Sequence, residues 1–330
     1  MDTERKILRT GALVIGCAVA LRLLSGSFLG TAVQAFGEQE LASVLLFLGT
    51  GRLVRTAEPK EPTEPEQTQP EVTQPAEEMT LPVFSAEDAG LVDMYSYCDY
   101  VVDVPALLQQ PLGWDLTQEG PAVLILHTHG TESYTKTESY EESSLYRTLD
   151  EGYNVVSVGE RIGQILEAGG VQVVHDRTLH DYPSYNGSYS HARAAIEKYL
   201  EDYPSIRMVL DIHRDAAEDV NGNQIGYTVQ TEKGEAAKLM LVVGTDAGGL
   251  HHPDWQQNMA LGVKLHVQLQ RRCPEICRSI SFRSSRFNQD LSPGALLVEV
   301  GAAGNTRQEA LLAAEILAQG ILDLARGTET

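Results

Sequence analysis

The chain has 330 residues, a 42% hydrophobic content and a formal net charge of −21, which allows one large folded domain with extensions. Such an acidic chain repels phosphate backbones, so its charge argues against nucleic acid as a partner. Cys273 and Cys277 lack a second cysteine pair, so they predict neither a Cys₄ metal site nor a disulfide-built scaffold. A local disulfide between these two is the less favoured alternative.

Residues 1–56 are predicted to attach the protein to the cell membrane. Basic residues near the start precede an apolar run that begins at Gly11, the pattern of a signal peptide or signal anchor. Arg22 interrupts the run, so a span of roughly 20 residues must continue to about Val33. We favour a single-pass anchor over cleavage near Ala35, and the positive-inside rule then places the rest of the chain outside the cytoplasm. Residues 41–55 form a second, shorter apolar patch, which predicts an amphipathic juxtamembrane helix.

Residues 57–90 are predicted to form a disordered linker. From Ala57 to Pro82, prolines alternate with glutamate, threonine and glutamine, and almost nothing apolar is available for burial. An extended segment of this kind holds a folded domain away from a surface. The predicted organisation is a cytoplasmic tip, anchor and juxtamembrane segment in 1–56, the linker in 57–90, and an extracytoplasmic domain in 91–330.

The remainder alternates between strand-like and helix-like segments. Apolar runs predict buried strands at Val123–Leu126, Val171–Val174, Met208–Leu210, Met240–Val243 and Ala295–Val300. Helical patterns occupy residues 155–166, 192–200, 256–271 and, after an Asn-Thr cap, 308–325. This alternation predicts an α/β domain with a mostly parallel central sheet flanked by helices. In such sheets, functional residues collect just beyond the carboxyl ends of the strands.

Three of the predicted strands end in residues that suit a catalytic metal. His129 and Glu132 follow the first strand as an H-x-x-E pair, His213 ends another strand, and Glu299 lies near the end of the last. Two imidazoles and a carboxylate around an open position are the usual ligands of a catalytic zinc, and a further glutamate can act as general base. Each residue alone is more often a satisfied polar group, but their coincidence favours a metal site. His127, predicted on the same side as His129, is a candidate to support it.

Several segments resemble the stage II sporulation protein P family: HTHGTESY, YNVVSVGERI, HDYPSYNGSYSHAR, DIHRDA and LLVEVGAAGNT. The resemblance runs in order from about Leu91 to Ala325. It implies a membrane-anchored, zinc-dependent N-acetylmuramoyl-L-alanine amidase that hydrolyses peptidoglycan during engulfment in endospore formation, with endopeptidase activity on the cross-linking peptides as well. It also implies partners, the sporulation protein D lytic transglycosylase and sporulation protein M.

The zinc amidase-like fold that the resemblance implies has a histidine, a glutamate, a second histidine and a late catalytic glutamate. His129, His213 and Glu299 match three of these positions. The middle carboxylate stays open, because counting back from the end of the following helix points to Glu151, whereas the H-x-x-E spacing points to Glu132. We favour Glu132, so the predicted Zn²⁺ ligands are His129, Glu132 and His213, with Glu299 as the base.

Arg214 and a polar, aromatic strip are predicted to contact substrate. Arg214 would help the metal to stabilise a tetrahedral oxyanion. Tyr185, Asn186 and Arg193 would line a glycopeptide groove, with Arg193 meeting a peptide carboxylate; an ordinary surface loop is the alternative. Two other functional classes compete with the amidase. One is a catalytically silent wall-binding module that recruits a partner hydrolase, although no ligand is missing, and the other is a carboxypeptidase-like metalloprotease with an arginine clamp.

Overall fold

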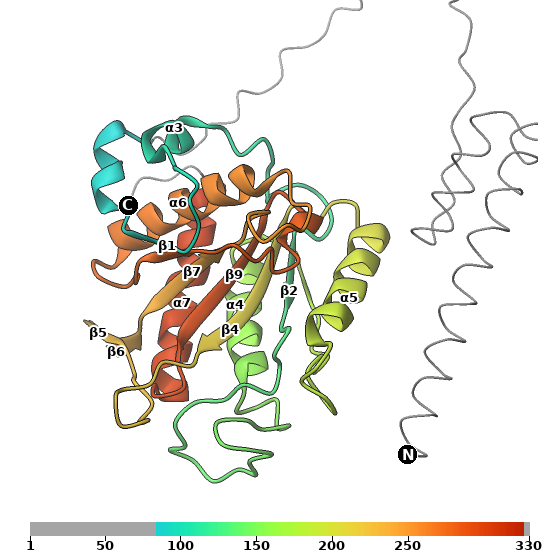
Figure 1. Cartoon of the computed structure of the whole chain (residues 1–330), viewed down its shortest axis with the longest axis vertical. Helices are drawn as coiled ribbons and strands as arrows, with labels where there is room; N and C mark the ends of the chain where they lie inside the picture. The colour runs from blue at the N-terminus through green and yellow to red at the C-terminus, as the bar shows by residue number, and fades with distance from the viewer. Residues whose placement is uncertain (1–83, 327–330) are drawn as a thin grey trace, which may run out of the picture. The chain divides into compact units, whose positions relative to one another are not determined.

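A seven-stranded sheet forms the centre of the computed structural model, which describes residues 84–326 (Figure 1). The strand order is β1-β8-β7-β9-β4-β2-β3, and all neighbouring pairs are parallel except β7 with β9. The strands of this sheet are β1 (Met94–Ser96), β2 (Val123–Leu126), β3 (Val173–His175), β4 (Met208–Asp215), β7 (Leu239–Val243), β8 (Ile280–Phe282) and β9 (Ala295–Ala302). A separate antiparallel hairpin consists of β5 (Thr228–Thr231) and β6 (Gly234–Ala237).

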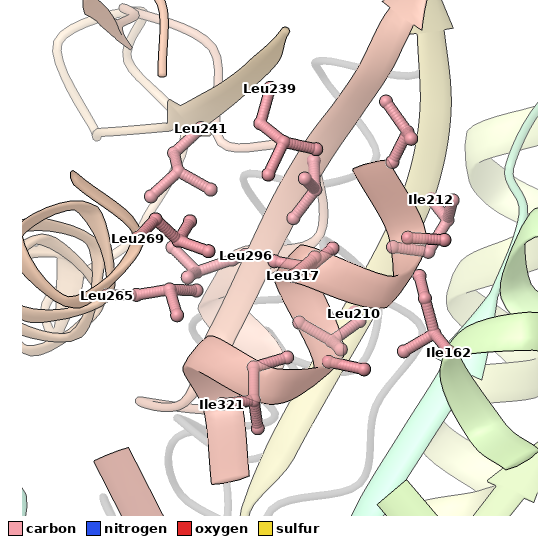
Figure 2. Packing of buried hydrophobic residues seen from close by; sticks show 14 of the residues in the cluster. Ile162, Leu210, Ile212, Leu239, Leu241, Leu265, Leu269, Leu296, Leu317 and Ile321 are labelled. Atoms are coloured by element: carbon pink, nitrogen blue, oxygen red, sulfur yellow. The ribbon is translucent and has the colours of Figure 1, made fainter. Parts of the chain in front are cut away.

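Helices cover both faces of the sheet, and the alternation of side chains along β2 shows which helices lie on which face. Val123 and Ile125 belong to the large core that β2 shares with α4, α6 and α7, whereas Leu124 and Leu126 pack with α5. Figure 2 shows the large core, where side chains of β4 and β9 meet those of α4, α6 and α7. The helices are η1 (Ala86–Leu91), α3 (Val104–Gln109), α4 (Val155–Ala168), α5 (Ser188–Asp202), α6 (Trp255–Arg272), η2 (Gln289–Leu291) and α7 (Arg307–Arg326).

The start of α4 follows from its sequence. The side chain of Asn154 accepts a hydrogen bond from the backbone N–H of Val156 at 3.0 Å, which caps the first turn. Within the helix, Gly159 lies against the β2 side of the sheet so closely that a Cβ atom there would stand 2.6 Å from the ring of His127. Only glycine allows that approach, so the position sets how near α4 lies to the end of β2.

The predicted α/β class with a mostly parallel sheet is confirmed, and every predicted strand and helix is present. The strands β4 and β9 run further than predicted, because their polar residues pair with each other in register. The sequence did not predict β1, β5, β6, β8 or α3. All five are short segments without a clear apolar period, and β1 and β8 in addition pair with each other across a long stretch of chain.

The folded domain begins earlier than the predicted residue 91. Phe84 is buried, and its carbonyl accepts a hydrogen bond from Gln109 Nε2 at 2.7 Å. Asp88 pairs with Arg271 on α6 at 2.7 Å, and the guanidinium of Arg271 lies 5.5 Å from the ring centre of Phe84. These long-range contacts attach the end of the predicted linker to the domain, a feature that local composition does not reveal.

The predicted anchor, the juxtamembrane segment and residues 57–83 of the linker lie outside the described residues. Between residues 84 and 326, no helix has both the length and the apolar character that crossing a membrane requires. Cys98, Cys273 and Cys277 are free thiols, so the less favoured disulfide is absent from this part of the chain.

Candidate active site

The loop after β2 brings His129 to the sheet face covered by α5. Thr128 fixes the turn, because its N–H and hydroxyl donate to the two carboxylate oxygens of Asp211 on β4, at 2.8 and 2.6 Å. The ring of His129 then stacks on Tyr185, with centroids 4.4 Å apart, and stands nearly perpendicular to the ring of His213 at 5.3 Å. The H-x-x-E segment and β4 therefore converge, as predicted.

His213 lies within β4 and not beyond the end of that strand as predicted, whereas Glu299 lies within β9, inside the predicted strand. They are register partners on β4 and β9, so their side chains leave the sheet on the same face. By alternation this is the face of Val209 and Ala295, which pack with α5. The residue two before His213, Asp211, shares that face, and its Oδ1 lies 2.9 Å from His213 Nε2.

Glu132 is buried beside His213. Its Oε2 lies 3.5 Å from His213 Nδ1 and accepts from the backbone N–H of Arg214 at 3.3 Å. The other oxygen, Oε1, lies 3.4 Å from Arg147 Nη2 and 3.7 Å from Arg214 Nη1. Arg214 is itself held by the carbonyls of Ser133 and Tyr146, at 2.9 and 3.0 Å, so its guanidinium organises the loop that carries Glu132.

The charges in the site are strongly coupled. Burial raises the pKa of Glu299 to about 8, and the nearby Glu132 carboxylate acts in the same direction. Burial also opposes charge on His213, but Asp211 and Glu132 outweigh it and raise the pKa of this imidazole well above its usual value. Glu132 itself keeps a pKa of about 2 despite its burial, because His213 and Arg214 stabilise the carboxylate. The two carboxylates beside His213 therefore favour the protonated form of its imidazole.

The donor set suits a metal ion in its chemistry. Among residues 84–326, His129 Nδ1 and Glu299 Oε2 are buried without a hydrogen-bond partner, and His213 Nε2 contacts Asp211 outside hydrogen-bond geometry. Unpartnered buried polar atoms are costly unless a ligand or ion satisfies them. A cation that displaced the proton from His213 would also compensate the surrounding carboxylates. As they stand, however, no three histidine, cysteine, aspartate or glutamate side chains in residues 84–326 are arranged to hold a metal ion.

Of the two candidates for the middle carboxylate, the structure brings only Glu132 to His213. Glu151 is partly exposed and pairs with Arg177 at 2.9 Å.

The prediction that His127 lies on the same side as His129 is wrong. The ring of His127 points towards α4, as expected from the alternation of side chains along β2, and its Nε2 lies 2.9 Å from His175 Nε2. The backbone turns after His127, so His129 points to the other face of the sheet.

Comparison with known proteins places the chain in a family. The family model of Stage II sporulation protein P (SpoIIP) matches residues 52–322. This chain belongs to the stage II sporulation protein P family. A curated relative, Stage II sporulation protein P of Bacillus subtilis (strain 168), is 28% identical over 219 residues, which make up 61% of this chain and 50% of the relative. The chain thus covers only half the length of that family member.

Two of the solved structures that are similar to this family member are amidases. The N-acetylmuramoyl-L-alanine amidase AmiC2 of Nostoc punctiforme is 18% identical with a TM-score of 0.36, and the match covers 62% of this chain and 98% of that one. The CwlD amidase of Clostridioides difficile, in complex with the GerS lipoprotein, is 12% identical with a TM-score of 0.37, covering 62% and 95%.

The three residues predicted to bind substrate lie at different distances from His129. Tyr185 is exposed; its ring stacks on His129 and lies 5.1 Å from the guanidinium of Arg147. Asn186 is exposed next to it. Arg193 lies further along on α5, where it pairs with Asp290 and Glu197, at 2.9 and 3.1 Å.

Sequence reasoning assigned no role to Asp211 and Arg147, which the structure places at the site of this family member, and it considered Tyr189 only as part of the polar, aromatic strip around Tyr185 and Arg193. Asp211 was detectable, because it precedes His213 by two positions on a strand and so shares its face. Tyr189 lies edge-on to His129 with centroids 5.6 Å apart. Arg147 belongs to a loop without periodicity, so no local signal identifies it.

Proposed function

We propose that this protein is a zinc-dependent peptidoglycan hydrolase that cleaves the amide bond between the muramoyl lactyl group and L-alanine. The observation that carries the proposal is the convergence of His129, His213 and Glu299 on one face of the sheet. Each of the three has one buried polar atom without a hydrogen-bond partner in the described part of the chain. Membership of the stage II sporulation protein P family supports the same substrate.

In this proposal His129, Glu132 and His213 hold Zn²⁺. The metal would supply Lewis acidity and lower the pKa of the attacking water. Glu299 is the general base, since its carboxyl lies on the neighbouring strand and burial raises its pKa to about 8. A carboxyl with a pKa near the working pH can accept the proton of the water and return it to the departing amine.

Arg214 is proposed to act mainly through Glu132, because its donors already bind loop carbonyls and that carboxylate. Its predicted contact with the oxyanion stays a prediction. Tyr185 and Asn186 are proposed to flank the substrate at the mouth of the site, with Arg193 further along the same side. A single-pass anchor, an extracytoplasmic domain, and association with sporulation proteins D and M remain part of the proposal.

A digest of purified sacculi tests the proposed function. The protein loaded with zinc should release peptides from muramic acid, which mass spectrometry detects as unsubstituted glycan strands. Loss of cross-links with intact muramoyl-peptide bonds would instead identify an endopeptidase. Binding to sacculi without any cleavage would identify a wall-binding module.

A further inference from the structure

A cavity of about 330 Å³ lies beside the site, between α5 and the turn that precedes η2. Its lining includes Tyr189, Arg193, Arg286 and Phe287. Tyr189 also stands edge-on to His129, with ring centroids 5.6 Å apart, so one aromatic ring borders both the site and the cavity. The volume falls in the range of roughly 300–1,000 Å³ in which proteins bind small ligands.

Two arginines face this cavity, and one carboxylate orients both. Arg193 Nη1 donates to Asp290 Oδ1 at 2.9 Å, and Arg286 Nη1 donates to Asp290 Oδ2 at 3.2 Å. Asp290 is nearly buried, with 9% of its side chain exposed, whereas the two arginines remain 28% and 24% exposed. Glu197 also pairs with Arg193, but at 49% exposure its charge is screened by water.

The guanidinium groups keep donors for a ligand. Within residues 84–326, Arg286 donates only through Nη1, to Asp290 and to the carbonyl of His251. A single carboxylate does not neutralise two guanidiniums, so an anion entering the cavity meets a positive wall. A planar guanidinium matches the geometry of a carboxylate, which it binds through two parallel hydrogen bonds.

The turn that carries Arg286 has an unusual backbone. Phe287 and Asn288 have φ angles of 50° and 58°, in the left-handed region that non-glycine residues rarely adopt. The side chain of Asn288 donates to the carbonyl of Tyr189 at 2.8 Å, which ties the turn to α5. Strained backbone of this kind persists where surrounding contacts hold it, and it is common at binding sites.

We propose that this cavity binds a free carboxylate of the substrate's peptide, with Arg193 and Arg286 as the anion-binding residues. The inference rests on the proposed function, because it makes the cavity a subsite next to the proposed scissile bond. In this proposal Tyr189, which contacts His129 and also lines the cavity, sets the distance between the scissile bond and the bound carboxylate.

The test uses the full-length chain and the free peptide that an amidase would release, which the enzyme cannot hydrolyse at that bond again. Calorimetry compares this peptide with a series in which each carboxylate in turn is converted to a carboxamide. One conversion should weaken binding about tenfold, the loss expected for a charge-assisted hydrogen bond. If no conversion weakens binding, the proposal is overturned.

Variants assign the effect to the cavity. Arg286→Gln should weaken binding of the free peptide about tenfold and remove the sensitivity to that conversion. Arg193→Lys keeps a positive charge beside Asp290 but loses the planar fork, and should give a similar loss with an unchanged Tm. Lys198→Gln removes a charge from the exposed face of the same helix and should bind like the parent. Retained sensitivity in Arg286→Gln contradicts the proposal.

The proposed function and the carboxylate subsite fail in different ways. A parent protein that discriminates carboxylate from carboxamide but never releases peptide from sacculi supports the subsite and removes the amidase assignment. A parent protein that digests sacculi but binds all the peptides equally keeps the amidase assignment and overturns the subsite.

Discussion

Glu132 and Glu299 are both buried carboxyl groups at the site, but their surroundings differ. Glu132 is flanked by His213, Arg147 and Arg214, which stabilise its anion. Glu299 Oε2 has no hydrogen-bond partner in the described part of the chain, so burial keeps its carboxyl close to neutral. The same residue type is therefore suited to two tasks, cation binding and proton transfer.

The Glu299→Gln variant separates these tasks. It preserves size and removes basicity, so zinc content and Tm should stay near the parent while the hydrolysis rate falls roughly 10²–10⁴-fold. Metal analysis, a thermal melt and a sacculus digest measure this. Glu167→Gln, on an exposed position of α4, is the matched control and should behave as the parent. Loss of zinc would make Glu299 a ligand, and retained activity would place the base elsewhere.

The proposed metal ligands can be tested by alanine variants. His129→Ala and His213→Ala should each lose zinc and activity. Glu132→Ala should lose most of the metal, because it removes the carboxylate beside Nδ1 of His213. Glu151→Ala should keep both metal and activity, since this residue pairs with Arg177 at a partly exposed position. The opposite result for the two glutamates would show that the middle ligand is assigned to the wrong residue.

At the scale of elements, the site depends on contacts between loops that no single strand or helix determines. Arg147 Nη1 donates to Thr131 Oγ1 and to Asp181 Oδ2, at 2.9 and 2.7 Å. Asp181 also accepts from the N–H and hydroxyl of Thr131, so three loop segments meet at one buried carboxylate. The same arginine lies over the ring of Tyr185 and beside Glu132.

We expect Arg147→Gln to destabilise the fold by about 1.5–3 kcal/mol, the usual contribution of hydrogen bonds to a charged group. Because Glu132 and Tyr185 lose a common support, zinc affinity and the rate should fall as well. Urea unfolding and metal titration measure the two effects. Arg177→Gln breaks the more exposed ion pair with Glu151. It should change neither the free energy of unfolding nor that of zinc binding by more than about 1 kcal/mol. A stable Arg147→Gln protein with parental zinc affinity would contradict this role.

At the scale of the whole domain, buried histidines make stability depend on pH. His266 on α6 is almost fully buried, and burial lowers its pKa to about 4. The unfolded chain binds a proton there near pH 6.5. The folded domain binds it only near pH 4, so stability falls as the pH drops from 6.5 towards 4, by up to about 3 kcal/mol for this residue. Above pH 6.5 the histidine contributes no slope.

Urea unfolding between pH 4 and pH 7.5 measures this dependence. A His266→Leu variant should show a shallower loss of stability in the acid range, whereas His251→Leu, at an exposed loop position, should keep the parental slope. Equal slopes in the parent and the His266→Leu protein would mean that other groups determine the acid sensitivity.

Truncation of the N-terminal region tests where the folded domain begins and whether the predicted anchor is needed. Since Phe84 packs against the domain, a protein that starts at residue 83 should fold and digest isolated sacculi. In the cell it should fail, because an untethered enzyme loses its high local concentration near the membrane. Full cellular function of an unanchored, secreted form would contradict the anchor. A start at residue 91 should lower the Tm, since it removes Phe84 and Asp88.

Periodicity and strand-end chemistry in the sequence determined the fold class, every long helix, the strands of the sheet centre, and the candidates His129, His213 and Glu299. These features are local, since an apolar period of two or near four is encoded in neighbouring residues. The family resemblance, confirmed by the model match over residues 52–322, came from the same short segments.

Only the tertiary structure decided the rest. The register of β4 with β9 placed Glu299 beside His213 inside the sheet, and loop closure chose Glu132 over Glu151 as the carboxylate near that histidine. The tertiary structure also brought α5 and the turn at residues 285–288 together around the cavity proposed to bind a carboxylate. Such pairings join residues far apart in the chain through burial and hydrogen bonds, and these interactions leave no periodic trace in the sequence.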